Sequence, residues 1–362
     1  MFLYTTSATM KRKYILPILL PVQFILVQIL SLFPAVIEQY YSKALYIYIS
    51  NICRTITGKV SFSIGDVIYF ILIALLLRWL WIKRKSWRKL WKENLLQILS
   101  WFSIFYFLFN FLWAINYHRV PLHEKMGFET EYSDTDLLVF TQKLIVKTNS
   151  LHLQITKDST MKVVVPFDRD AVYDKNVSGY QNLEKRYSAF RYDKPSVKNS
   201  LLSLPLTYMG FSGYMNPFTG EAQVNNLVPM YSFPATASHE MAHQLGYASE
   251  SEANFVGFLA AVSNDDLYMQ YSGYTLALRY CLRNWQIRDE KKAAALLKTL
   301  NPGIRKNFDE SKAFWEQHET FIESGFKLFY DNFLKFNQQE EGLESYSRFV
   351  DMIVNYYKTR SL

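Results

Sequence analysis

From Ser238 to Gly246 the sequence reads SHEMAHQLG, and the rest of the chain can be understood from this segment. His239 and His243 are four residues apart, so a helix would place both imidazoles on the same face, one turn apart. Two histidines in this H-E-x-x-H arrangement can bind a zinc ion, and Glu240 between them can accept a proton from a water molecule at the metal. A glycine at 246 suits the end of such a helix. The segment therefore predicts a metal-binding helix, whereas two core histidines on an amphipathic helix are the simpler alternative.

A third ligand is needed, because a catalytic two-histidine zinc site has three protein ligands and one open position. Glu250 and Glu252 both follow within nine residues of His243. Ser249 and Glu252 have the spacing of a capping box, which predicts that a second helix starts here and gives Glu252 a structural role. The residue pattern thus favours Glu250 as the third ligand and keeps Glu252 as the alternative.

The predicted second helix has one face of small or short side chains around Glu250. That face comprises Glu250, Ala253, Asn254, Gly257 and Ala261. A small face allows close packing against the histidine-bearing helix, so that Glu250 points at the metal. Asn254, one turn further along, is predicted to orient one of the ligands without binding the metal itself.

The segment Glu250-Ser251-Glu252-Ala253-Asn254 resembles the E-x-x-A-[ND] element that follows H-E-x-x-H in gluzincin peptidases. The membrane-embedded CAAX-protease/HtpX group and the ImmA/IrrE-type peptidases both use this element. Their first glutamate is the third zinc ligand, so the resemblance implies the same role for Glu250. Those families usually place the element tens of residues further downstream, and this departure keeps Glu252 open as the ligand.

The chain as a whole resembles an uncharacterised bacterial membrane-protein family, domain-of-unknown-function family 3810. The similar stretches span nearly the full length and are Phe62–Asp66, Trp113–Arg119, Asn216–Glu221, the metal segment and Glu344–Tyr346. This resemblance implies a zinc peptidase and supplies no substrate.

Three apolar runs in the first third predict transmembrane helices. They cover Tyr14–Ile37, Ile64–Ile82 and Leu95–Asn116, each long enough to cross a bilayer. A cleaved signal peptide is the alternative for the first run, but the run is long and no small-x-small cleavage site ends it. We therefore expect a membrane-anchored α+β chain. Residues 1–116 would form a three-helix transmembrane region, and residues 117–362 a mostly helical zincin-like domain with a small β-hairpin.

The charge distribution predicts the orientation of the chain. Residues 1–116 hold 13 Lys/Arg and three acidic residues, whereas the remainder holds 27 Lys/Arg and 29 acidic residues. Short basic segments stay in the cytoplasm, so the N-terminus and the Lys83–Lys92 loop are predicted inside. The domain after Asn116 then lies outside the cytoplasm, anchored in the cell (inner) membrane. Because most of the excess positive charge lies in the membrane region, where it determines the orientation of the chain, the sequence gives no support for nucleic-acid binding.

The soluble part is predicted from turns and apolar patterns. Asp134 to about Asn149 is expected to be helical, Met161–Phe167 a strand, Asp168–Tyr192 irregular, and Leu201–Tyr208 extended. Gly213–Met215 and Glu221–Val228 flank the turn Asn216–Glu221, which predicts a hairpin. Its second strand, Ala222, Gln223, Val224 and Asn225, would be an edge strand that binds the substrate by strand addition. A plain structural hairpin fits the pattern equally well. The rest is expected to be helical, in Asp266–Gln286, Glu290–Leu300, Ser311–Phe336 and Leu343–Tyr357.

A few further residues have chemistry that the pattern leaves unassigned. Cys53 and Cys281 are predicted to be isolated packed thiols, although both fall on or near the outer side, where a disulfide is permitted. The remaining histidines and two tyrosines are single candidates for a ligand or an oxyanion donor; they are His118, His123, His152, His318, Tyr271 and Tyr274.

Together these patterns predict a membrane-anchored zinc metallopeptidase that cleaves a protein or peptide substrate outside the cytoplasm. The alternative is a non-catalytic zinc-binding membrane sensor or envelope assembly factor with a zincin-like domain. The intact Glu240 argues against this alternative, because a purely structural site does not need that carboxylate. A transporter has little support, because three spans are few and their ionisable residues lie near the ends.

Overall fold

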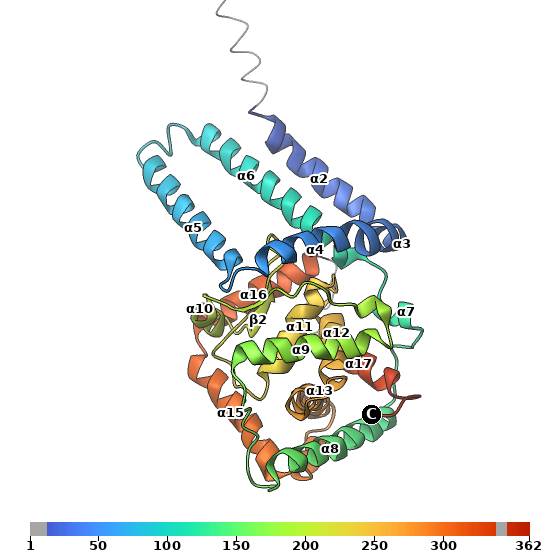
Figure 1. The fold of residues 1–362 in the computed structure, drawn as a ribbon. Coiled ribbons are helices and arrows are strands. Elements are labelled where there is room, and N and C mark those ends of the chain that lie inside the picture. Colours follow the sequence, from blue (N-terminus) through green and yellow to red (C-terminus); the bar gives the residue numbers. More distant parts are fainter. Residues whose placement is uncertain (1–12, 338–345) are drawn as a thin grey trace, which may run out of the picture.

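The computed structural model describes residues 13–337 and 346–362, so Glu344 and Ser345 of the stretches noted above lie outside it. The described chain is mostly helical and contains one small three-stranded sheet. Helices α2 (Ile15–Ser31), α5 (Ile64–Lys83) and α6 (Trp91–Leu112) project from one side of a helical body (Figure 1).

The projecting helices carry exposed apolar side chains along most of their length. Among the described residues, α5 and α6 are long and apolar enough to cross a membrane, and α2 makes a third if it is counted together with the bent helix that follows. Two or three such helices are consistent with a membrane protein. The expected second and third runs correspond to α5 and α6.

The prediction that the first apolar run forms one helix through Ile37 is wrong. α2 ends at Ser31, and the chain bends by 95° before the segment Pro34–Thr57. This segment consists of α3 (Pro34–Val36), the π-helical η1 (Ile37–Leu45) and α4 (Tyr46–Thr57). Pro34 lacks a backbone N–H and suits the first turn of a new helix, so the helix restarts there in a new direction.

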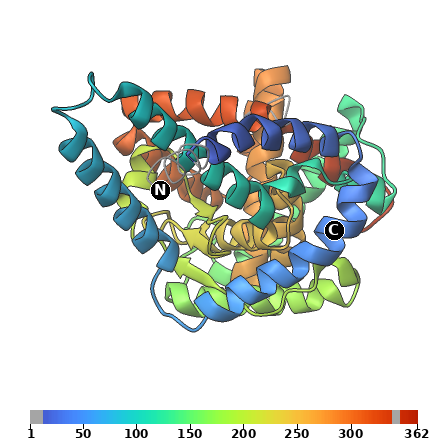
Figure 2. The same cartoon turned by 90° about the horizontal axis from the view of Figure 1, so that it is seen from above.

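Helix α4 lies across the base of the projecting helices, above the body (Figure 1). In the view from above it runs over the edge of the body that carries α9 (Arg169–Glu184) (Figure 2). Ser50 and Arg54 face the body and are buried, whereas Tyr48 and Ile52 point outward and are exposed. The segment between the first and second apolar runs therefore contains an amphipathic helix.

The main core is built around α12 (Glu250–Val262), in which every residue from Glu250 to Ala261 is buried. It packs between α11 (Phe233–Gln244), α13 (Leu267–Arg288), α9 and α17 (Tyr346–Tyr356). The remaining elements of the body are η2 (Ala114–His118), α7 (Leu122–Met126), α8 (Asp134–Thr156), η3 (Ser188–Phe190), α10 (Ser203–Tyr208), α14 (Glu290–Lys298), α15 (Pro302–His318) and α16 (Phe321–Phe336). The predicted start of α8 is confirmed by a complete capping box between Ser133 and Asp136.

The sheet confirms the predicted hairpin but not its free edge. Strands β1 (Val197–Asn199), β2 (Gly213–Met215) and β3 (Ala222–Val224) are ordered β1-β3-β2. β3 pairs in parallel with β1 and antiparallel with β2. The prediction that Ala222, Gln223, Val224 and Asn225 form an edge strand is therefore wrong, because β1 occupies the position beside β3. The two edges of the sheet are β1 and β2.

Three further predictions for the body are wrong. Met161–Phe167 is not a strand; the backbone of Val163 instead exchanges hydrogen bonds with the side chain of Asn307. The segment taken as irregular contains α9, whose first turn is capped by Asp168, which accepts a hydrogen bond from the Ala171 N–H. The segment taken as extended contains α10.

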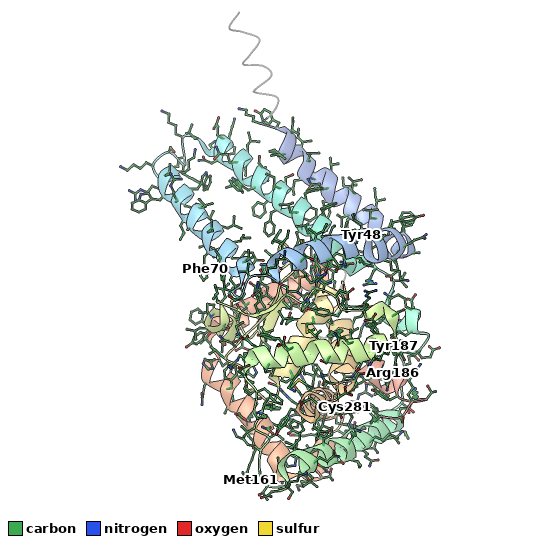
Figure 3. The ribbon with its side chains drawn as sticks, in the orientation of Figure 1. Tyr48, Phe70, Met161, Arg186, Tyr187 and Cys281 are labelled. Atoms are coloured by element: carbon green, nitrogen blue, oxygen red, sulfur yellow. The ribbon has the colours of Figure 1, made fainter. Side chains whose placement is uncertain are left out.

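Both cysteines are free thiols, Cys53 half-buried and Cys281 buried. The prediction of two isolated thiols is confirmed. Cys281 is labelled on α13, deep in the body and far from α4, which carries Cys53 (Figure 3).

Candidate metal centre

Helix α11 carries both histidines and ends in a tight turn that reverses the chain into α12. Gly246 in this turn has a φ of +84°, which an L side chain rarely adopts. A Cβ at this position would also lie 2.9 Å from Cε1 of Tyr46 and 3.0 Å from Oδ1 of Asn116. The prediction that a glycine ends this helix is confirmed. The absence of a side chain at Gly246 also allows Tyr46 of α4 and Asn116 of η2 to pack against the turn.

The two helices pack closely because Gly257 of α12 faces the backbone of His239. A Cβ on Gly257 would lie only 2.8 Å from the His239 nitrogen and 2.9 Å from its Cα. The small face predicted for the second helix therefore lies against α11. This close packing brings the first turn of α12 to the histidine side chains.

The predicted ligand atoms of His239, His243 and Glu250 converge on one point. The two Nε2 atoms are 3.1 Å apart. Glu250 Oε2 lies 3.2 Å from His239 Nε2, and Oε1 lies 3.7 Å from His243 Nε2. Ligand bonds of roughly 2.0–2.1 Å in a tetrahedron separate the ligand atoms by about 3.3 Å. The residues present therefore fit a single zinc-sized ion.

The ring of His243 is oriented by the backbone. Its Nδ1–H donates to the carbonyl of Tyr247 at 2.7 Å, which leaves the Nε2 lone pair facing the other ligand atoms. The Trp113 indole N–H donates to the His243 carbonyl at 3.3 Å. Contacts from the end of α6 therefore help to fix the position of α11.

Glu250 and Glu252 have different surroundings. Glu252 accepts a hydrogen bond from the backbone N–H of Leu122 at 2.5 Å. The predicted capping box is wrong, because the Ser249 side chain makes no cap bond and instead contacts the Ser251 hydroxyl. Glu252 thus anchors the connector after η2 to α12, while Glu250 faces the histidines.

Glu240 is buried beside the ligand atoms. Its Oε1 would lie 2.7 Å from a Cβ on Gly213, so only a glycine in β2 leaves space for the carboxylate. Its Oε2 has no hydrogen-bond partner among the described residues. Burial raises the pKa of Glu240 to about 8, although the nearby His239 opposes this. A carboxyl group with such a pKa can exchange a proton near neutral pH.

The pKa values of Glu250 and His243 favour metal binding, whereas that of His239 opposes it. Burial lowers the pKa of His239, but its hydrogen bond to Glu250 and the charges of Glu250 and Glu240 outweigh burial and raise the pKa. Burial raises the pKa of Glu250, but its hydrogen bond to His239 and the charges of both histidines outweigh burial and lower the pKa to about 2. Burial lowers the pKa of His243 to about 4. An ionised carboxylate and a neutral imidazole are the forms that bind a metal ion.

A cavity of about 330 Å³ opens over these groups. It is lined by β2, by α11, by the end of α6 and by α16. Tyr330 of α16 lines it and donates a hydrogen bond to Glu250 Oε1 at 2.5 Å. No motif surrounds Tyr330, which lies 80 residues from Glu250, so the sequence contained no signal for this contact. Asn254 also lines the cavity, with Nδ2 unpartnered among the described residues, and its orienting role stays a prediction.

Three of the other candidate side chains have structural contacts elsewhere. His152 Nε2 bonds the Met161 carbonyl, and His318 Nδ1 donates to the Phe314 carbonyl. Tyr271 donates to Asn307 in the core. In the part of the chain that the structure describes, the group of metal-binding side chains that comes together is His239, Glu240 and His243, and Glu250 adjoins it.

These features define a mostly helical protein that has two or three helices apolar enough for a membrane and a buried cluster of histidines and glutamates able to hold a metal ion. The chain belongs to the family described as "Protein of unknown function (DUF3810)", whose model matches residues 41–354. No curated protein and no solved structure matches the chain. The match confirms the whole-chain resemblance and includes every residue of the cluster.

Proposed function

We propose that this protein is a membrane-anchored zinc metallopeptidase. His239, His243 and Glu250 would hold the ion. The proposal rests mainly on one observation. The buried Glu240, whose Oε2 has no hydrogen-bond partner among the described residues, lies beside the proposed ligand atoms of His239, His243 and Glu250, and the distances between these atoms suit tetrahedral coordination. Zinc at such a site supplies Lewis acidity, which polarises a scissile carbonyl and lowers the pKa of water to about 7. The resemblance of the 239–254 segment to gluzincin peptidases supports the same assignment.

Glu240 acts as the general base in this proposal. Its carboxylate takes the proton of the attacking water and passes it to the leaving amine. Burial keeps bulk water from competing for the carboxylate, and the glycine at 213 keeps the path from β2 to Glu240 open.

The substrate is proposed to bind along β2 rather than β3. β2 is an edge strand, and Gly213, Tyr214 and Met215 all line the cavity. An extended peptide added to this edge would form main-chain hydrogen bonds and pass directly over Glu240. Recognition through the backbone predicts an extended, unfolded segment as the substrate.

The activity can be tested in cells that carry Glu240→Gln in place of the wild-type chain. Comparative proteomics of the membrane and its exterior should show uncut substrates accumulating in the variant, with the corresponding fragments lost. An unchanged peptide profile together with an intact phenotype would instead favour a non-catalytic zinc-binding sensor or assembly factor.

The orientation is a second part of the proposal. The basic residues of the Lys83–Lys92 loop should hold that loop in the cytoplasm, with the body and the metal centre outside the inner membrane. A reporter active only in the cytoplasm should be active when fused near Ser86 and silent when fused after Leu362. A reporter active only outside should give the complementary pattern, and the reverse of both patterns would overturn the orientation.

A further inference from the structure

A second cavity, of about 870 Å³, lies between η1–α4 and the body and shares no lining residue with the cavity over the candidate metal centre. Its lining is strongly basic, with six cationic and two acidic side chains. These are Lys43, Arg54, Arg119, Lys125, Arg186 and Arg191, with Glu38 and Asp193. Neither the metal site nor the peptidase proposal uses this cavity.

The acidic residues neutralise only part of this charge. Asp193 pairs with Arg191 at a nitrogen–oxygen distance of 2.7 Å. Glu38 is shared by three cations, with nitrogen–oxygen distances of 2.9 Å to Arg119, 3.1 Å to Lys125 and 3.5 Å to Lys43. Glu38 and Arg119 have side chains that are only 8% and 7% exposed. A partly buried group with excess positive charge attracts an anion, because protein and membrane screen it less than water does.

Arg54 is the most deeply buried of the cations that line this cavity. Its residue is 4% exposed, and the guanidinium lies 5.0 Å from the ring centroid of Tyr192. Nε donates to Ser50 at 3.1 Å and Nη2 to Asn51 at 3.0 Å, whereas Nη1 has no hydrogen-bond partner among the described residues. Because Nη1 is itself inaccessible to water, Arg54 contributes its positive charge to the cavity that it lines and not a hydrogen bond from Nη1.

The position of the cavity indicates which kind of anion it would meet. On α4, Tyr48, Ile52 and Ile56 are 70%, 60% and 63% exposed and face away from the body. Ile47, 47% exposed, reaches the lining of the cavity. Figure 3 shows Tyr48 on α4 near the base of the projecting helices, with Tyr187 and the cavity-lining Arg186 below it on the body. The cavity therefore lies just below an apolar helix face that suits the headgroup region of a bilayer.

We propose that this cavity binds the phosphate of an anionic phospholipid headgroup. The exposed guanidinium of Arg186 would donate to the phosphate oxygens from the body side, and the buried charge of Arg54 would add to the attraction. A free phosphate would satisfy the same donors, but it would leave most of the volume and the apolar lining of Ile47, Leu122 and Met126 unused. The excess positive charge favours a lipid with a net negative headgroup over a zwitterionic one.

The bound headgroup would also hold α4 against α11. Tyr46 and Ser50, on the body-facing side of α4, donate hydrogen bonds to the carbonyl of Gln244 at 3.1 and 2.9 Å. Gln244 directly follows His243 and is the last residue of α11. Lipid binding therefore fastens the membrane-side helix to the end of α11. This inference does not depend on zinc or on catalysis.

The test uses the full chain purified in mild detergent, with lipid binding measured by native mass spectrometry. Phosphatidylglycerol, phosphatidylethanolamine and inorganic phosphate are titrated separately. Wild type should prefer phosphatidylglycerol over phosphatidylethanolamine. Arg186→Gln should weaken phosphatidylglycerol binding about tenfold or more, as expected for lost charge-assisted hydrogen bonds, and Arg54→Gln about three- to tenfold through the loss of its buried charge.

Arg283→Gln is the matched control, because Arg283 is exposed on α13 and does not line the cavity. It should bind phosphatidylglycerol like wild type. Arg186→Gln guards against a folding defect of Arg54→Gln, since an exposed side chain can be replaced without disturbing the core. Equal binding by all four proteins would overturn the proposal. Arginine-dependent binding of inorganic phosphate without retention of phosphatidylglycerol would contradict the lipid assignment and favour a soluble phosphate compound.

Discussion

Glu240→Gln should lower the rate of peptide-bond hydrolysis by roughly 10²–10⁴-fold, the usual contribution of a general base. Glutamine has nearly the same shape as glutamate, so it should fit against Gly213 without a new clash. It cannot accept the proton of the attacking water, however. Because Glu240 is not among the predicted ligands, the zinc content should remain close to that of wild type.

The measurement uses the purified full chain and a proteome-derived peptide library, with the products identified by mass spectrometry. Glu316→Gln on α15 is the matched control, since that side chain is exposed and distant in sequence from the site. It should cleave the same peptides at the wild-type rate. Retention of full activity by Glu240→Gln, with zinc still bound, would show that another group acts as the base.

Glu250→Ala should strip the metal, which makes it the second large effect. The change removes a predicted ligand, and it also removes the acceptor for Tyr330. Loss of a group that only supports a ligand typically costs about 10–100-fold in metal affinity, and loss of the ligand itself should exceed that. The helices should stay folded, because α12 retains its apolar contacts around Ala253 and Phe255.

Glu252→Ala provides the comparison within the same turn. It should keep zinc, but it leaves the buried Leu122 N–H without its acceptor, at a cost of about 1–3 kcal/mol of unfolding free energy. Zinc per chain and the melting temperature are measured on the same samples. If Glu252→Ala released zinc and Glu250→Ala kept it, the assignment of the third ligand would be reversed.

Local signals in the sequence explain most of what could be predicted about the site. The four-residue spacing of the histidines, the glycine at 246 and the small face around Gly257 all act within one or two helical turns. These features are sufficient to predict that α11 and α12 pack closely with Glu250 near the histidines. The role of Glu252 could not be predicted in this way, because a tertiary contact with Leu122, 130 residues away, replaces the local cap.

Long-range pairing explains the failures in the body. β1, β2 and β3 have three residues each, and such short strands leave little periodicity to read. The hairpin of β2 and β3 could be predicted because the two strands are adjacent in the sequence. β1, which precedes α10 in the chain, pairs with the other side of β3, so β3 is not an edge strand. Tyr330 was missed for the same reason, since only the packing of α16 over the cavity brings it to Glu250.

The membrane region shows how a continuous apolar run can hide a break. Hydropathy alone does not distinguish one span through Ile37 from α2 followed by a bent segment. Pro34 was the available signal, because a proline in this position starts a helix more readily than it continues one. The amphipathic pattern of α4 then places polar residues such as Ser50 and Arg54 against the body.

The central claim, a zinc site formed by two imidazoles and one carboxylate, is tested most directly by X-ray absorption at the zinc edge. The sample is the full chain purified without added chelator, and it should contain about one zinc ion per chain. The account predicts nitrogen and oxygen neighbours at about 2.0–2.1 Å, with the multiple-scattering signature of two imidazole rings, and this signature should fall to one ring in His243→Ala. Absence of zinc, or a first shell without imidazole, would contradict the account.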